Sequence, residues 1–178
     1  TGCTVCLQLP KSELSVVSTI FASYDFAKEI AGEYGDVSML LKPGAEAHSY
    51  EPTPKDIVTI GECDVFIYVG GENDAWVDDI LESVDTSDMI IIKMLDLVDK
   101  YSEEHVEGME CHEEDCKEHD HSDTGEWDEH VWTDPLNAVK ISEKIKEVLC
   151  EEDSSNKVEY ERNFTAFSRA LTELDMEF

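Results

Sequence analysis

The chain has 178 residues, enough for one domain or slightly more. Its 43 acidic and 13 basic residues give a formal net charge of −30, which argues against a nucleic-acid binder, because such proteins neutralise phosphates with Lys and Arg. The same charge argues against docking on anionic lipid through a basic face. The hydrophobic share of 41% is enough for a packed core, and no apolar run reaches the roughly 18 residues typical of a membrane-spanning helix.

The first three residues, Thr1-Gly2-Cys3, resemble the end of a bacterial lipobox, in which the cysteine is acylated. We therefore expect residues 1–12 to be a tether, and acylation of Cys3 would anchor an extracytoplasmic protein, periplasmic or on the cell surface, without a spanning helix. The alternative interpretation is an arbitrary chain boundary. Of the other cysteines, Cys111 and Cys116 are close enough in sequence for a small disulfide loop, or else for two thiolate metal ligands.

Apolar, β-branched runs alternate with segments of helical spacing along most of the chain. The second expected helix has Thr53 as its N-cap and Pro54 at its first position, and a later one has Asp134 and Pro135 in the same roles. Gly35 is expected to end the first helix. Strands are expected over residues 14–18, 36–41, 64–69 and 89–95, and helices over residues 21–34, 54–63, 75–83, 136–150 and 158–178. This order predicts an α/β fold, a four-stranded parallel sheet flanked by helices.

The segment from residue 102 to residue 130 differs in composition from the rest of the chain. Its 29 residues include 13 Asp or Glu, one Lys and five of the six histidines, so its net charge is −12. Such a segment could concentrate cations, and we expect a secondary metal site formed by His112, His119 and His121. The alternative is a solvated loop that binds no metal.

Two further histidines, His48 and His130, lie in segments that are expected at one edge of the sheet. His48 follows the second expected strand, and His130 lies just before an expected helix. Ligands of open parallel sheets bind beyond the carboxyl ends of the strands, and two imidazoles that converge there would form half of a tetrahedral zinc site. The alternative for a lone histidine is a solvated or otherwise satisfied polar residue.

Five motifs, taken together, resemble the metal-binding lipoproteins that serve bacterial ABC importers for zinc or manganese, the cluster A-I solute-binding proteins. They are STIFASYDFAKEIAG, PGAEAHSYEPTP, DVFIYVGGENDAW, EHVWTDPLNA and YERNFTAFSRALTELD, in the order of that family. The resemblance covers nearly all of residues 13–178. One departure is Glu129, which stands where the family often has a proline before the second histidine.

The resemblance implies two lobes joined by a long helix, with the metal held between them. It assigns residues 13–150 to a metal-binding N-terminal lobe with an acidic, His-rich loop over residues 102–129, and residues 151–178 to the start of the linking helix. The C-terminal lobe is then absent, and with it the remaining ligands. His48 and His130 become the main metal ligands, and the His-rich loop favours Zn²⁺ over Mn²⁺.

Carboxylates near the two histidines in sequence are candidates for orienting the imidazoles. They are Glu46, Glu51 and Asp134, although Glu51 could equally be an ordinary loop carboxylate. The exposed apolar side of residues 158–178 is expected to remain accessible or to form a dimer.

The functional expectation is a solute-binding protein that captures Zn²⁺ outside the cytoplasm and delivers it to an ABC permease. The alternative is a surface adhesin or host-interaction lipoprotein in which the metal is structural. An enzyme is not expected, because the sequence contains no nucleophile elbow, Walker loop or HExxH motif. A metallohydrolase would need a general base, and Glu51 and Glu129 are the candidates.

Overall fold

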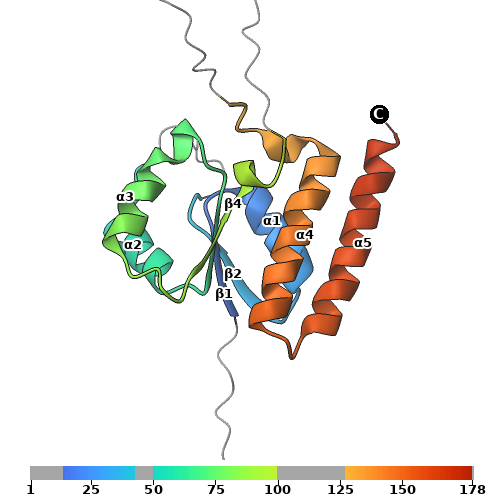
Figure 1. The fold of residues 1–178 in the computed structure, drawn as a ribbon, viewed down its shortest axis with the longest axis horizontal. Helices are drawn as coiled ribbons and strands as arrows, with labels where there is room; N and C mark the ends of the chain where they lie inside the picture. Colours follow the sequence, from blue (N-terminus) through green and yellow to red (C-terminus); the bar gives the residue numbers. More distant parts are fainter. Residues whose placement is uncertain (1–13, 43–49, 100–126, 178) are drawn as a thin grey trace, which may run out of the picture.

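The computed structural model describes residues 14–42, 50–99 and 127–177. A four-stranded parallel sheet with the order β2-β1-β3-β4 forms its centre (Figure 1). The strands are β1 Leu14–Ser18, β2 Gly35–Met39, β3 Val65–Tyr68 and β4 Ile90–Lys93. The predicted α/β class and parallel sheet are therefore confirmed, and β1 has the predicted bounds.

The other three strands are shorter than predicted, and β2 also begins one residue earlier. The run that contains β4 continues as a 3-10 helix over Met94–Asp96, so strand pairing stops at Lys93. Met94 and Leu95 in that short helix are buried. Burial therefore continues beyond the strand, which is why the apolar pattern alone suggested a longer one.

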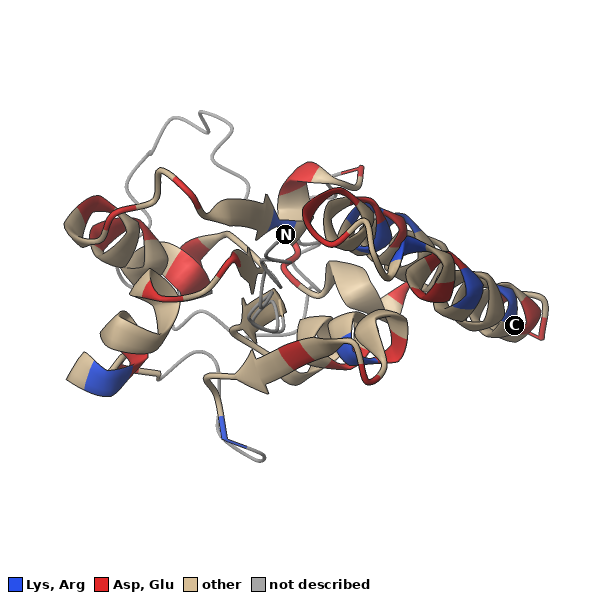
Figure 2. Ribbon diagram, turned by 90° about the horizontal axis from the view of Figure 1, so that it is seen from below, with Lys and Arg blue, Asp and Glu red and all other residues tan. Residues whose placement is uncertain are grey.

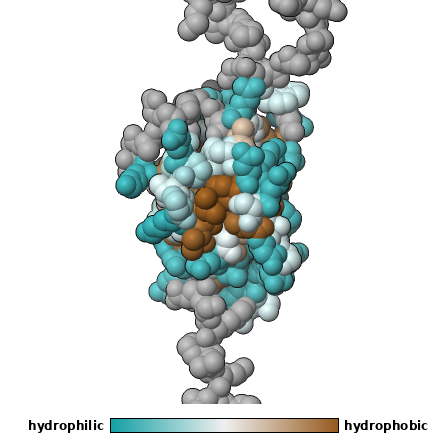
Figure 3. Space-filling view, turned by 90° about the vertical axis from the view of Figure 1, so that its left-hand side faces the viewer, coloured by the Kyte–Doolittle hydropathy of each residue, from teal (hydrophilic) through white to brown (hydrophobic). Residues whose placement is uncertain are grey.

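Helices α2 (Pro54–Gly61) and α3 (Ala75–Ser83) cover one face of the sheet. Their buried residues pack with Val17, Phe66 and Tyr68, which point to this face from β1 and β3. The predicted cap of α2 is confirmed, because Thr53 and Asp56 form a reciprocal capping box at its first turn. Figure 3 shows apolar residues gathered on this side of the molecule, and the Val58 side chain of α2 is 55% exposed.

Helices α1 (Phe21–Ala31) and α4 (Pro135–Glu152) cover the opposite face. Val16, Val65 and Ile67 point to this side and form the larger core with them. The prediction that the first helix continues to residue 34 was wrong, because α1 ends at Ala31, and its C-cap Gly32 has a φ of 60° that breaks the helix. Gly35 instead begins β2.

Helix α5 (Lys157–Asp175) lies beside α4 and α1 (Figure 1). Its Tyr160 is fully buried, and its Phe164, Phe167 and Leu171 are partly buried against the larger core. The expectation of an exposed apolar side was therefore wrong for these four residues, since the chain itself covers them. Val158, Leu174 and Met176 remain exposed.

The outer surface of α4 and α5 carries interleaved charges of both signs (Figure 2). Lys157 with Glu161 and Arg169 with Glu173 are pairs spaced four residues apart. Exposed pairs of this kind contribute little to stability, so this surface is an ordinary solvated helix face. Among the described residues, no helix is both long enough and apolar enough to cross a membrane.

Candidate metal centre

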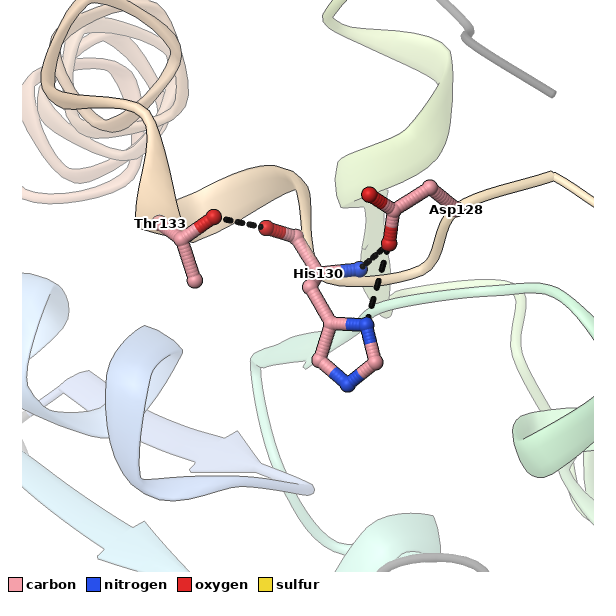
Figure 4. A network of polar contacts seen from close by, with 3 residues as sticks. All are labelled: Asp128, His130 and Thr133. Atoms are coloured by element: carbon pink, nitrogen blue, oxygen red, sulfur yellow. Dashed lines mark hydrogen bonds and ion pairs between the residues drawn. The ribbon is translucent and has the colours of Figure 1, made fainter. Parts of the chain in front are cut away.

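A tight turn presents His130 at the start of the 3-10 helix Val131–Thr133, which leads into α4. The backbone N–H of His130 donates a hydrogen bond of 2.8 Å to Oδ1 of Asp128. The same carboxylate oxygen lies 3.0 Å from Nδ1 of the imidazole (Figure 4). Asp128 therefore fixes both the backbone and the ring of His130.

The contact with Asp128 determines which imidazole nitrogen is available to a ligand. The hydrogen bond from the His130 backbone lowers the pKa of Asp128, and its contact with the imidazole acts in the same direction, so the carboxylate is ionised at neutral pH. An ionised carboxylate only accepts hydrogen bonds, so Nδ1 of the neutral ring carries the proton. The lone pair then lies on Nε2, which points away from Asp128 in Figure 4. A neutral imidazole held in this way by a carboxylate is the usual form of a zinc-binding histidine.

The residues that follow His130 fix the direction in which the chain leaves the turn. Thr133 donates from its hydroxyl to the His130 carbonyl at 2.7 Å, and its backbone N–H donates to the same oxygen at 3.0 Å. The Trp132 ring lies 5.6 Å from the imidazole, centroid to centroid. The His130 side chain is nevertheless 53% exposed. The site is therefore ordered on one side and open on the other.

Asp134, which the sequence suggested as an orienting carboxylate, serves as the N-cap of α4 instead. Its Oδ1 accepts hydrogen bonds from the backbone of Leu136 at 2.7 Å and of Asn137 at 3.3 Å, and Pro135 occupies the first helical position. The predicted cap is confirmed. The predicted role beside His130 was wrong, because Asp128 is the carboxylate at Nδ1.

The turn between β3 and α3 lies next to this site. Its Gly70 and Gly71 have φ values of 88° and 96°. Oδ2 of the buried Asp74 accepts backbone hydrogen bonds from Val69 at 2.8 Å and Gly70 at 3.0 Å. Burial raises the pKa of Asp74 and the charge of Glu129 raises it further, whereas the two hydrogen bonds oppose the shift. Glu129, the residue preceding His130, packs against Gly71 of this turn.

His48 lies outside the described residues, but both ends of its segment are placed. Before it, Leu41 donates its backbone N–H to Thr19, directly beyond β1. After it, the Tyr50 ring packs edge-on against Trp76 of α3 at 5.2 Å. Tyr50 is two residues from His48, and Trp76 lies shortly after the Gly70-Gly71 turn. The described residues that flank this segment therefore lie just beyond the end of β1 and against α3.

Most of the other predicted site residues belong to parts of the chain that the structure does not describe. His112, His119 and His121, together with Glu46, Cys3, Cys111 and Cys116, lie outside the described residues. Glu51 is described and exposed. Within residues 14–42, 50–99 and 127–177, no group of three or more His, Cys, Asp or Glu is arranged to hold a metal ion.

Sequence reasoning missed Asp128 as a functional residue. Aspartate often accepts a hydrogen bond from the backbone two residues later, so the Asp-Glu-His order was an available signal. It was obscured because Asp128 is one of 13 acidic residues in the same segment.

Comparisons with known proteins agree on one family. A model of the family described as zinc-uptake complex component A, periplasmic, matches residues 16–178. The zinc-binding protein AdcA of Streptococcus pyogenes is 33% identical over 180 residues, which cover 96% of this chain and 34% of that protein. The high-affinity zinc uptake system protein ZnuA of Bacillus subtilis is 34% identical over 166 residues, which cover 92% of this chain and 50% of that protein. The chain thus spans between a third and a half of these relatives.

Solved structures show the same arrangement of the chain. The Zn(II)-bound AdcA of Streptococcus pneumoniae matches 93% of this chain and 32% of its own, with a TM-score of 0.74 and 28% identity. The laminin-binding protein Lmb of Streptococcus agalactiae, described as having adhesin and metal-transporting activity, matches 93% of this chain and 55% of its own, with a TM-score of 0.71 and 25% identity.

Proposed function

The chain belongs to the family of zinc-uptake complex component A, periplasmic, and we propose that it captures Zn²⁺ outside the cytoplasm for delivery to an ABC permease in the membrane. The observation that carries this proposal is the pairing of Asp128 with Nδ1 of His130, which leaves Nε2 as the metal-binding atom. Relatives that match nearly the whole chain are named for zinc binding or zinc uptake, and this supports Zn²⁺ over Mn²⁺ as the cargo.

His48 is proposed as the second ligand of the main site. Its support is positional, because the described residues that flank its segment lie just beyond the end of β1 and against α3. Two imidazoles leave at least two positions of a tetrahedral zinc ion to other donors. We propose that residues 13–150 form the metal-binding lobe and that residues 151–178, which contain α5, lead to a second lobe, which supplies those donors.

The acidic segment has a separate proposed role. His112, His119 and His121, with neighbouring carboxylates, would form a weaker secondary site that raises the local zinc concentration near the main one. Titration of the triple variant His112→Ala/His119→Ala/His121→Ala tests this. Loss of a weak zinc-binding step with the strong step retained supports the secondary site, and an unchanged titration contradicts it.

Calorimetric titration of the chain with Zn²⁺ and Mn²⁺ tests the main site. His48→Ala and His130→Ala should each weaken zinc binding, and the double variant should lose the strong step. His105→Ala is the matched control, because it removes a histidine assigned to neither site. Unchanged zinc binding in the double variant would overturn the ligand assignment. Growth of a zinc-uptake mutant in low zinc, restored by the intact gene and not by its His130→Ala form, tests the delivery step.

The structural match to Lmb supports a second candidate function, a surface adhesin in which the metal is structural. The two candidates differ in their response to chelators. Binding to immobilised laminin that is lost on chelation and in the His48→Ala/His130→Ala variant, while low-zinc growth is unaffected by these substitutions, favours the adhesin. Loss of low-zinc growth in the double variant, with no specific laminin binding by the unsubstituted protein, favours zinc capture.

Two finer proposals concern attachment and assembly. If Cys3 is acylated, radiolabelled palmitate should be incorporated by cells that produce the protein and not by those that produce its Cys3→Ala form. A dimer through α5 would use the exposed Val158, Leu174 and Met176. Light scattering over a concentration series tests this, and a constant monomer mass would contradict it. Catalysis forms no part of the proposed function.

A further inference from the structure

Glu129 packs directly over the backbone of Gly71, although 58 positions separate them in the sequence. A methyl group added to Gly71 would lie 2.6 Å from Cδ and 2.7 Å from Cγ of Glu129, well inside van der Waals contact. The side chain of Glu129 therefore occupies the space that any other residue at position 71 would need.

The surface on which Glu129 rests is held in place independently. Asp74 accepts hydrogen bonds from the backbones of Val69 and Gly70, which tie the turn to the start of α3. Asp74 is only 6% exposed. Gly71 is thus part of a rigid edge of the sheet, and a side chain packed on it is fixed relative to the sheet.

From these contacts we propose that Glu129 is a positioning residue, which sets the place of His130 relative to the sheet by packing on Gly71. The proposal rests on the proposed function, since it concerns the ligand His130. Asp128 orients the imidazole within its own turn, but that turn is local and does not by itself fix the distance to β3. Glu129, adjacent to His130, connects the His130 turn to the end of β3 through its contact with Gly71.

The chain offers a matched control for this contact. Gly70 also has a positive φ, of 88°, and a methyl group there would meet the flexible side chain of Lys93 rather than Glu129. Gly70→Ala and Gly71→Ala therefore impose the same kind of backbone strain. Only the methyl group of Gly71→Ala would displace Glu129, the residue next to His130.

The experiment compares Gly70→Ala, Gly71→Ala, Glu129→Ala and Gly71→Ala/Glu129→Ala in the full chain. Zinc affinity is measured by titration, stability by urea unfolding, and the His130 imidazole by its ¹⁵N and ¹H NMR shifts in the metal-free protein. We expect Gly71→Ala and Glu129→Ala to weaken zinc binding by about 10-fold, in the range seen when residues supporting a metal ligand are removed, and to shift the His130 signals. Gly70→Ala should lower stability similarly to Gly71→Ala but leave the His130 signals in place.

The double variant isolates the contact. In the Glu129→Ala background the Glu129 atoms nearest to the Gly71→Ala methyl group are gone, so Gly71→Ala no longer displaces residue 129 through them. Its effect on the His130 signals should then vanish. Equal effects of Gly70→Ala and Gly71→Ala on those signals, or unchanged signals in Glu129→Ala, would overturn the proposal. Failure of the proposed function is a different result, in which His130→Ala binds zinc as wild type does.

Discussion

Asp128 and His130 are joined by two contacts of one carboxylate oxygen, 2.8 Å to the backbone nitrogen and 3.0 Å to Nδ1 of the ring. One residue therefore sets both the fold of the turn and the tautomer of the proposed ligand. The pairing uses no distant part of the chain, so it should form whenever the turn does.

Replacing Asp128 with alanine should weaken zinc binding by about 10- to 100-fold, the effect typical of removing the carboxylate that orients a metal-binding histidine. The ring of His130 would then be free to rotate and to adopt either tautomer. Calorimetric titration of Asp128→Ala with Zn²⁺ measures the loss. Asp85→Ala is the matched control, because Asp85 accepts the same type of bond from the backbone of Ser87, at 3.0 Å, with no histidine nearby in sequence. Equal zinc affinities of Asp128→Ala and the wild type would count against this role.

Asp134→Ala should lower stability without changing zinc affinity. Its carboxylate caps the first turn of α4 through Leu136 and Asn137, and loss of such a cap costs about 1 kcal/mol. Urea unfolding measures the loss in free energy, and zinc titration should agree with wild type to within about 2-fold, less than half of a kcal/mol. A loss of zinc affinity as large as that of Asp128→Ala would restore the role at the metal that the sequence suggested for Asp134.

Tyr160 should make the stability of the protein sensitive to alkaline pH. Its hydroxyl is 2.9 Å from Oδ2 of Asp153, to which it donates, and burial followed by this bond raises the Tyr160 pKa above its usual value of 10. A raised pKa means that the contribution of the neutral phenol is complete below about pH 10 and is lost as the pH rises through the folded-state value. Stability should therefore fall above about pH 10.

Tyr160→Phe should cost about 1–3 kcal/mol at pH 7, because it leaves a buried carboxylate with one fewer donor, and should reduce the alkaline loss. Urea unfolding between neutral and alkaline pH measures both effects. Tyr24→Phe is the control, since Tyr24 is a partly buried tyrosine that packs against the same core. The prediction would be contradicted if the wild type and Tyr160→Phe lost the same free energy of unfolding between neutral and alkaline pH.

Cys63 should resist alkylation in the folded protein. Burial, with a smaller contribution from the charge of Asp64, raises the pKa of its thiol to about 12, so almost no thiolate forms at pH 8. Peptide mass spectrometry after iodoacetamide treatment should find Cys63 unmodified under native conditions and modified in guanidinium chloride. Modification at the same rate in both would show that the thiol is accessible.

The sequence was sufficient for the fold class because short apolar runs alternate with helical spacing, and because α2 and α4 begin at recognisable caps. Asp134-Pro135 and Thr53-Pro54 both start helices as predicted. The end of α1 was placed too late because Gly35 was taken as the terminating glycine, whereas Gly32 with its φ of 60° ends the helix. The packing of α5 on this end could not be predicted. Asn163 of α5 donates a hydrogen bond of 3.0 Å to the Ile30 carbonyl, a contact that spans 133 positions and leaves no local pattern.

The site was predicted only in part, because sequence patterns reveal local features and not contacts between distant segments. His130 and the helix that follows it are local features, and so is the turn of Asp128, although other acidic residues in the segment hid it. The packing of Glu129 on Gly71 joins two distant segments and has no signature in either. His48 and the loop histidines lie outside the described residues, so their roles remain proposals.

The most direct test of the central claim is an NMR titration of the ¹⁵N-histidine-labelled protein with Zn²⁺ at neutral pH. We predict that, as the first equivalent is added, the Nε2 signal of His130 moves to the position of a metal-bound nitrogen while Nδ1 keeps its proton, held by Asp128. If the protein binds that equivalent of zinc and the Nε2 signal of His130 does not move, His130 is not a ligand and the proposed site is wrong.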